Sequence, residues 1–385
     1  MVLLGVFAVA TASCSGKDSA GSYYNAGMDA LESGNYQEAS DNFKKAIEKK
    51  EDKAAYYIAD GIALVKLGQY EDALTEFDHA VVDMKSSITD KNKKKAFRGK
   101  GIAYYYMGDY ESAISTLIEA KEIDQVNDLN PDINSYLAEC YLAQDKYAEA
   151  IAVYDGMIEE DSKSAVAYVL RAKAQALAGN VEKAKEDFNQ AIGLDKKNYQ
   201  YYLLAYETLT EGGNESAAAE FLKSASELSP KTKEERYYAD KVAYYQGKTE
   251  EAIASLTEIA PEYIEAYCLL GEIYYANAQY SNAIDSYVTY MGADGATPSD
   301  KVYYDLALCY METENYTSAL EYIRAGLATA DKKFEGELKY EEIYALEKSG
   351  EFNEAYELAK EYVTVYPDDE KMQRELIFLE TRYNK

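Results

Sequence analysis

The chain of 385 residues contains no tryptophan, one histidine, four cysteines and five prolines. The lone histidine, His79, cannot hold a metal ion by itself, and no cysteine lies at a spacing that would complete a site. The cysteines show neither CxxC pairing nor regular intervals, which argues against a disulfide framework or zinc. Cys140, Cys268 and Cys309 fall within expected helices and are interpreted as small buried apolar residues.

Familiar catalytic motifs are also missing. The sequence has no GxSxG, HExxH, P-loop or dinucleotide-binding glycine motif. Its 69 acidic residues create many carboxylate pairs, which say nothing about acid–base catalysis without geometry. We therefore expect no catalytic residue, no cofactor and no metal, and we interpret the protein as non-enzymatic. The enzyme hypothesis would require a deep pocket with converging titratable groups.

Positive charge is scarce relative to negative charge. Forty basic residues face 69 acidic ones, which gives a net charge of −29. Such a chain repels phosphate backbones and anionic lipid headgroups, so nucleic acid is excluded as an expected partner. The acidic excess serves solubility or favours basic partners. Hydrophobic residues make up 48%, which is typical of a folding chain rather than a disordered one.

An apolar run, VLLGVFAVATA, occupies residues 2–12. Eleven residues are too few to cross a bilayer as a helix, but they suit the core of a signal peptide. The next residues, ASCSG at 12–16, resemble a bacterial lipobox, whose cysteine becomes lipidated. Two features depart from that motif, because Thr11 stands where an aliphatic residue is preferred and no basic residue precedes the run.

The lipobox resemblance implies a signal peptide over 1–13 and a lipidated Cys14, with 14–21 as a flexible tether. The protein would then be extracytoplasmic and anchored by lipid to the bacterial cell membrane. An ordinary cleaved signal peptide and a buried N-terminal segment are the alternatives.

A short pattern recurs along most of the chain with a period centred on about 34 residues. Each copy begins with one leading residue, usually aromatic, and an alanine follows three residues later. A large apolar residue comes four positions after the alanine. The leading residues are Tyr36, Tyr70, Tyr110, Tyr147, Val181, Glu215, Thr249, Tyr280, Tyr316 and Phe352. The alanines are Ala39, Ala73, Ala113, Ala150, Ala184, Ala218, Ala252, Ala283, Ala319 and Ala355.

Two glycine positions accompany the pattern. One precedes the leading residue, where a turn needs a backbone conformation that side chains resist, and is filled by Gly34, Gly68, Gly108, Gly179, Gly247 and Gly350. The other lies in a preceding helical segment, where two antiparallel helices must approach closely, and is filled by Gly27, Gly61, Gly101 and Gly271. All five prolines fall between repeats, where helix breakers cost little.

Together these positions resemble the tetratricopeptide repeat. The resemblance implies an all-α, right-handed α-solenoid of about ten helix–turn–helix units, because a single pair cannot bury its apolar face and neighbours must stack. Repeats 1–8 would span 22–290 and repeats 9–10 would span 300–367. The Gly-containing segment 291–299 is a candidate linker or hinge, and another long junction is expected near 85–94.

The last segment, 368–385, places Met372, Leu376 and Leu379 near helical spacing with charges between them. We expect it to form a capping helix over the last repeat. The whole register requires the repeated alanines to be buried in helices.

The family resemblance also implies a function. First helices of such repeats line a concave groove, which would make this chain a scaffold for a peptide or protein partner, with basic partners favoured by charge. Tyrosine suits such a surface because it makes broad, amphipathic contacts. The candidate groove residues are Tyr24, Arg98, Glu139, Tyr237, Glu272, Tyr304, Tyr340 and Tyr344. For each of them, ordinary packing or solvent exposure is the alternative.

A glycan-binding module of an envelope or exopolysaccharide system is the alternative function, because sugars contact stacked tyrosines and carboxylates. Exposed aromatic platforms would favour glycan, and an unbroken charged groove would favour protein. The sequence does not indicate the oligomeric state.

Overall fold

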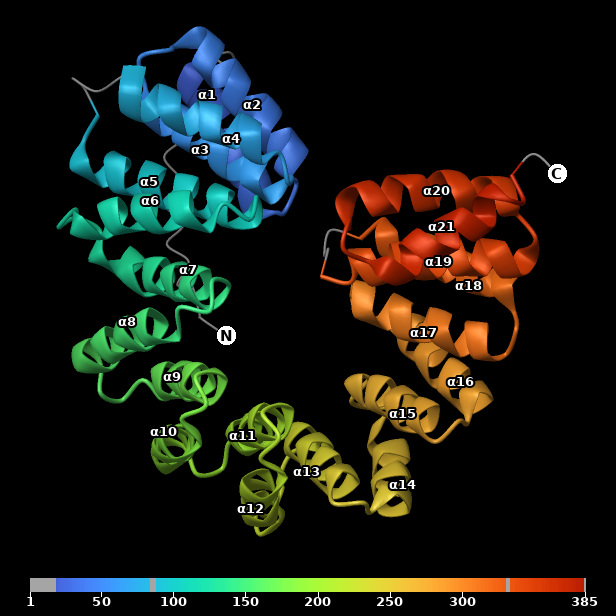
Figure 1. Ribbon diagram of the computed structural model, residues 1–385. Helices are drawn as coiled ribbons and strands as arrows, with labels where there is room; N and C mark the ends of the chain where they lie inside the picture. The colour runs from blue at the N-terminus through green and yellow to red at the C-terminus, as the bar shows by residue number, and fades with distance from the viewer. Residues whose placement is uncertain (1–18, 84–87, 330–332, 384–385) are drawn as a thin grey trace. The chain divides into compact units, whose positions relative to one another are not determined.

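The computed structural model describes residues 19–83, 88–329 and 333–383. Within these ranges the regular structure is helical, and the α-helices form ten hairpins followed by one further helix (Figure 1). The first helices of the hairpins are α1 (Ala20–Glu32), α3 (Ala54–Lys66), α5 (Asp90–Tyr106), α7 (Asn130–Leu142), α9 (Ala165–Leu177), α11 (Tyr199–Glu211), α13 (Lys233–Tyr245), α15 (Glu265–Ala276), α17 (Asp300–Glu312) and α19 (Glu335–Ser349). The second helices are α2 (Tyr36–Lys49), α4 (Tyr70–Asp78), α6 (Tyr110–Glu122), α8 (Tyr147–Glu160), α10 (Val181–Leu194), α12 (Glu215–Ser226), α14 (Thr249–Ile259), α16 (Tyr280–Met291), α18 (Tyr316–Leu327) and α20 (Phe352–Val365). The final helix is α21 (Glu370–Glu380).

The second helices begin at the leading residues of the repeat, whether these are aromatic, as in Tyr36, or polar, as in Glu215. All ten repeated alanines lie inside these helices and have none of their surface exposed. The methyl group is fully enclosed at that position, so a larger side chain would have to displace its neighbours. The predicted register and the all-α repeat fold are therefore confirmed.

Glycine in the first helix is explained by the large side chain that faces it, an aromatic ring at Gly27, Gly61 and Gly271 and Leu117 at Gly101. A Cβ atom placed on Gly27 would lie 2.6 Å from the Phe43 ring, and one on Gly271 would lie 2.6 Å from the Tyr287 ring. The equivalent glycines of the second and third hairpins are as tightly covered. Both rings are almost completely buried, and burying a ring of this size stabilises the fold by about 1.5–3 kcal/mol.

The turn inside each hairpin contains one residue with a positive φ angle. The six predicted glycines adopt it, and so does Gly213. The remaining three hairpins use residues with side chains, namely Asp145, Ala278 and Glu314, at φ angles of 55°, 57° and 57°. The turn geometry is thus common to all ten hairpins, although glycine is not.

The last helix caps the array. Met372 and Leu379 of α21 are buried against residues of α19 and α20, and Leu376 is partly buried beside them. The Asp369 side chain accepts hydrogen bonds from the backbone N–H groups of Lys371 and Met372, which fixes the start of the helix. The predicted capping helix is confirmed.

One junction differs from its prediction. Lys94, expected in a loop, lies in α5 and is fully buried. Its ammonium donates hydrogen bonds to the Ile123 carbonyl at 3.0 Å and to the side-chain oxygens of Asn127 and Asn130 at 3.3 and 2.7 Å. These bonds hold the segment between α6 and α7. Lys94 therefore has a structural role inside the fold, whereas its charge had favoured an exposed loop.

The chain divides into two compact units, and the boundary crosses the sixth hairpin. Unit 1 comprises Met1–Lys196 with Thr208–Asn214, and unit 2 comprises Lys197–Glu207 with Glu215–Lys385. The segment 291–299 lies inside unit 2; its first residue is the last of α16, the others connect α16 to α17, and its role as a hinge stays a prediction.

The predicted signal peptide and Cys14 fall outside the described residues. Helix α1 begins at Ala20, so the last two residues of the predicted tether are helical. Among the helices of the described ranges, none combines the length and apolar character that crossing a bilayer requires.

Candidate functional site

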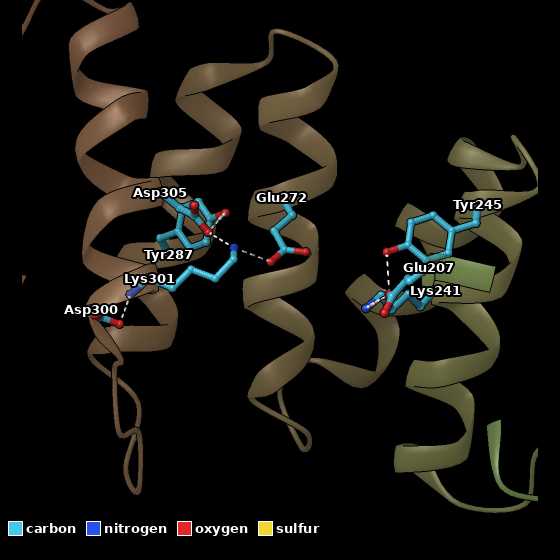
Figure 2. A network of polar contacts seen from close by, with 8 residues as sticks. All are labelled: Glu207, Lys241, Tyr245, Glu272, Tyr287, Asp300, Lys301 and Asp305. Carbon is cyan, nitrogen blue, oxygen red and sulfur yellow. Dashed lines mark hydrogen bonds and ion pairs between the residues drawn. The ribbon is translucent and has the colours of Figure 1, made fainter. Parts of the chain in front are cut away.

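The first helices of unit 2 form a continuous face. Helices α13, α15, α17 and α19 lie side by side in that order, each touching the next. Charged and aromatic residues of α11, α13, α15 and α17, together with Tyr287 of the second helix α16, form two polar clusters, drawn in Figure 2. We call the surface that carries both clusters the first-helix face of unit 2.

The first cluster centres on Lys301 of α17. Its ammonium lies 3.0 Å from Oε1 of Glu272 on α15 and 2.5 Å from Oδ2 of Asp305, one turn further along α17. The hydroxyl of Tyr287 donates to the same Asp305 oxygen at 3.4 Å. Burial opposes the charge on Lys301, but Glu272 and Asp305 outweigh burial and raise its pKa. Lys301 is therefore a fixed cation that ties two neighbouring first helices together.

The second cluster joins α11 to α13. The ammonium of Lys241 and the hydroxyl of Tyr245 each lie 3.0 Å from Oε1 of Glu207. Burial, followed by the charge of Glu207, raises the pKa of Tyr245. The phenol thus stays neutral and donates a hydrogen bond to the Glu207 carboxylate. One carboxylate accepts from two different side chains, so its orientation is well defined.

Several tyrosines lie between and beside these clusters. Tyr237 is partly buried, with ring contacts to Tyr238 and Tyr263 at centroid distances of 5.1 and 5.4 Å. Burial and then Glu272 raise its pKa. Tyr304 packs at 5.5 Å from Phe334. Both predicted residues thus contribute to packing while keeping part of their surface accessible.

The other predicted tyrosines of unit 2 lie on α19. Tyr340 makes an edge contact with Tyr362 at 6.2 Å. Tyr344 is 39% exposed, and the ammonium of Lys348 lies 4.6 Å from the centre of its ring. Tyr344 is therefore the predicted aromatic residue of this unit that offers the most open contact surface.

The predicted residues of unit 1 are more dispersed. Tyr24 packs against Phe43 and Tyr56, at 5.7 and 5.0 Å. Arg98 of α5 is paired at 2.5 Å with Asp132 of the adjacent first helix α7. Glu139 is exposed on α7. Nothing in this arrangement joins the three into one site.

Of the eight predicted groove residues, Glu272 alone belongs to the clusters of Figure 2. Sequence reasoning missed Lys301, Asp305, Glu207 and Lys241. A signal was present, because the ion-paired residues on adjacent first helices are separated by 34 positions in Glu207–Lys241 and by 29 in Glu272–Lys301. Opposite charges about one repeat apart were the clue.

Metal and thiol chemistry find no support in the described ranges. Burial raises the pKa of Cys140, Cys268 and Cys309 to about 12, so these thiols stay protonated and unreactive. His79 is partly exposed and pairs with Asp83 at 2.5 Å. Within the part of the chain that the structure describes, no three side chains of the metal-binding types converge.

Stacked helical hairpins with a polar, aromatic face on their first helices define a class of scaffold proteins whose fold serves protein–protein interaction. Comparison with known families agrees. Tetratricopeptide repeat profiles match residues 24–87, 104–176, 165–198 and 268–334, which together cover more than half of the chain. The chain belongs to the tetratricopeptide repeat family.

Individual relatives are distant. The TPR repeat-containing protein YpiA of Bacillus subtilis is 25% identical over 294 residues, which cover 74% of this chain and 67% of that protein. The SGT1 homolog of Bos taurus is 32% identical over 117 residues, which span 30% of this chain and 32% of that protein.

Solved structures include YrrB, described as a TPR protein with an unusual peptide-binding site. It is 21% identical with a TM-score of 0.38, and the match covers 54% of this chain and 97% of YrrB. A tetratricopeptide repeat protein from Parabacteroides merdae is 18% identical with a TM-score of 0.44, and the match covers 62% of this chain and 91% of that one.

Proposed function

We propose that this chain is a non-enzymatic binding scaffold of the bacterial cell envelope, which holds a peptide or protein partner on the first-helix face of unit 2. The observation that carries the proposal is the composition of that face. Fixed ion pairs at Glu207–Lys241 and at Glu272–Lys301–Asp305 alternate with half-buried tyrosines on adjacent helices. Preset polar groups beside rigid aromatic surface are what a peptide needs for orientation and contact area.

Charge also supports a basic partner. Both lysines of the clusters are already paired with carboxylates, and Glu272 is 43% exposed despite its ion pair. Across the whole chain acidic residues exceed basic ones by 69 to 40. A basic segment would find complementary charge on this surface, which speeds encounter and selects among partners.

The test uses a photocrosslinking residue at Tyr275. This tyrosine follows Glu272 by three positions, so it lies on the same side of α15. We expect p-benzoylphenylalanine at Tyr275 to capture a protein when cells are irradiated and the chain is purified from the envelope. The matched control places it at Val288, which is 41% exposed on the second helix α16. Equal capture of protein at Tyr275 and at Val288 would show that the first-helix face of unit 2 is not the binding surface.

The envelope location rests on the lipobox-like sequence around Cys14. Replacing Cys14 with alanine is expected to abolish labelling by a palmitate analogue and to move the chain from the membrane fraction to the soluble fraction. Release without any loss of labelling would contradict lipidation at this residue.

A glycan ligand is the second candidate, and one cluster in unit 1 favours it. Tyr70 and Tyr106 stack with an interplanar angle of 10°, and Tyr106 is 50% exposed. Tyr136 adds an edge contact to Tyr106 at 6.3 Å. Exposed stacked rings of this kind suit a sugar face, so capture of polysaccharide through Tyr106, with no protein at Tyr275, would reverse our preference.

A further inference from the structure

A cavity of about 450 Å³ opens in unit 2 beside the last hairpin. Its walls come from α17, from the first two turns of α19, from the end of α20 and from the start of α21, drawn in orange and red in Figure 1. Four tyrosines line it, namely Tyr304, Tyr340, Tyr362 and Tyr366. Two of them, Tyr304 and Tyr340, were singled out from the sequence; the other two complete an aromatic enclosure.

The rings are held in place by neighbours. Tyr362 and Tyr366 pack with their centroids 4.6 Å apart, and Tyr340 meets Tyr362 edge to face at 67°. The hydroxyl of Tyr362 donates to Oδ2 of Asp369 at 3.2 Å. Gly336 leaves room for the Tyr366 ring, because a Cβ atom there would lie 3.0 Å from the Tyr366 hydroxyl. The enclosure is therefore formed before any ligand arrives.

Carboxylates surround the same space. The acidic residues Glu337, Glu341 and Asp369 line the cavity, together with one basic residue, Lys371. Burial and then the nearby Glu312 raise the pKa of Glu341, and no described cation is paired with Glu337 or Glu341. Two carboxyl groups without a cationic partner, those of Glu337 and Glu341, thus line the cavity next to aromatic faces, and a bound cation would offset the burial and repulsion that disfavour the charge on Glu341.

The combination of aromatic faces and carboxyl groups restricts the chemical class of ligand that the cavity can bind. Anions are repelled by the carboxylates. A metal ion is also a poor fit, because the acidic side chains do not converge as a ligand set within the described residues. A broad organic cation satisfies both features, since a planar guanidinium stacks on tyrosine rings and its N–H groups pair with carboxylates at the edges.

We propose that this cavity, which we call the tyrosine cage, binds the guanidinium of an arginine in a basic segment of the partner protein. The inference rests on the proposed function, because it names the chemistry of the partner. Lysine fits less well, since its compact ammonium cannot stack and pair in two directions at once.

The test titrates the full chain with fluorescein-labelled peptides of sequence Gly-Ser-Xaa-Gly-Ser, in which Xaa is arginine, lysine or glutamine. We expect the arginine peptide to bind at least about fivefold more tightly than the glutamine peptide, and more tightly than the lysine peptide. Equal affinity for arginine and lysine would overturn the assignment of a guanidinium.

Variants locate the binding. The double substitution Glu337→Gln with Glu341→Gln is expected to lower the affinity for the arginine peptide at least about fivefold. The control combines Asp285→Asn with Glu321→Gln, two exposed positions on second helices with the same change in net charge, and should stay within about twofold of the parent. Equal weakening by both pairs would show diffuse attraction to an acidic surface and overturn the cage.

A third variant guards against misfolding. Lys371→Gln removes the one cation of the cavity wall and is expected to tighten arginine binding, which a damaged fold would not do. No change or a loss of affinity would contradict the cage. The peptide titration and the photocrosslinking can fail independently of each other. If a partner is captured at Tyr275 but the arginine peptide does not bind, the scaffold proposal stands and the tyrosine cage is wrong. If the arginine peptide binds as expected but no partner is captured, the tyrosine cage stands and the scaffold proposal is wrong.

Discussion

Asp240 illustrates what a single residue contributes to this fold. It lies on α13 with 8% of its surface exposed, and its Oδ2 atom has no hydrogen-bond partner within the described residues. Burial raises its pKa from 3.8 to about 6; contact with Ser255 and the charge of Arg236 oppose this effect, and Glu258 adds to it. Between about pH 4 and about pH 6, Asp240 therefore keeps its proton in the folded protein and loses it in the unfolded chain.

The sign of the pH dependence follows from that pKa. A raised folded-state pKa contributes stability that is complete below about pH 4 and is lost as the pH rises through about 6. Asp240→Asn keeps the shape and removes the ionisation. We expect the variant to be more stable than the parent, with an advantage that grows by about 1 kcal/mol between about pH 5 and pH 8.

Thermal unfolding of both proteins at several pH values above the isoelectric point measures this difference. The exposed change Glu250→Gln, in the first turn of α14, controls for the altered net charge. An advantage of Asp240→Asn that shrinks with rising pH would show that Arg236 outweighs burial.

Among the elements, the turns inside the hairpins are the clearest case of one geometry served by different residues. Seven hairpins place glycine at the left-handed position, whereas Ala278 holds a φ of 57° before α16. An L-residue pays about 1–2 kcal/mol for that conformation. Glycine avoids this strain but loses more backbone entropy on folding, a term of about 0.4–1 kcal/mol.

We therefore expect Ala278→Gly to stabilise the hairpin of α15 and α16 by about 0.5–1 kcal/mol. Ala278 is exposed, so the change removes a methyl group and no other contact of consequence. Hydrogen exchange of the amides in α15 and α16 should slow about two- to fivefold, because about 1.4 kcal/mol corresponds to a factor of ten.

Gly247→Ala, at a φ of 81° in the preceding hairpin, is the reciprocal change and should speed exchange in α13 and α14. If Ala278→Gly accelerates exchange instead, the entropy of the unfolded chain outweighs the strain at this turn.

The hairpins were predictable because their positions are fixed by backbone proximity. Where two helices cross at Gly27, no side chain fits against Phe43, and where they cross at Ala39, the methyl group has no exposed surface. Such constraints recur along the array of hairpins, so small residues recur in the sequence with the period of the repeat. Turn residues were less predictable, since Asp145 and Glu314 tolerate a conformation that only glycine adopts freely.

The binding surface was only partly predictable, because it depends on contacts between neighbouring hairpins. Tyr304 and Tyr340 were identified by their place in a first helix. Tyr366 and Asp369 belong to the irregular connection around Pro367, outside the repeated pattern, and reach the cavity only because of the path that α20 and α21 take. No periodicity encodes that path.

For the molecule as a whole, charge imposes two opposing effects. The net charge of −29 makes acidic side chains repel one another, which opposes compaction, while the same field attracts basic partners. Added salt screens both effects, since the Debye length falls from about 30 Å at 0.01 M to about 10 Å at 0.1 M. Stability and binding should therefore respond to salt in opposite directions.

We expect the unfolding temperature to rise by a few degrees between about 20 and 300 mM potassium chloride, while association with the partner captured at Tyr275 slows at least about fivefold. Scanning calorimetry and stopped-flow mixing measure the two quantities, and sodium chloride at the same ionic strength controls for specific ion binding. Association that ignores salt would mean that the partner is not basic. An unfolding temperature that falls with salt would mean that ion pairs such as Glu272–Lys301 outweigh the repulsion, because screening weakens attraction and repulsion alike and the larger of the two decides the sign.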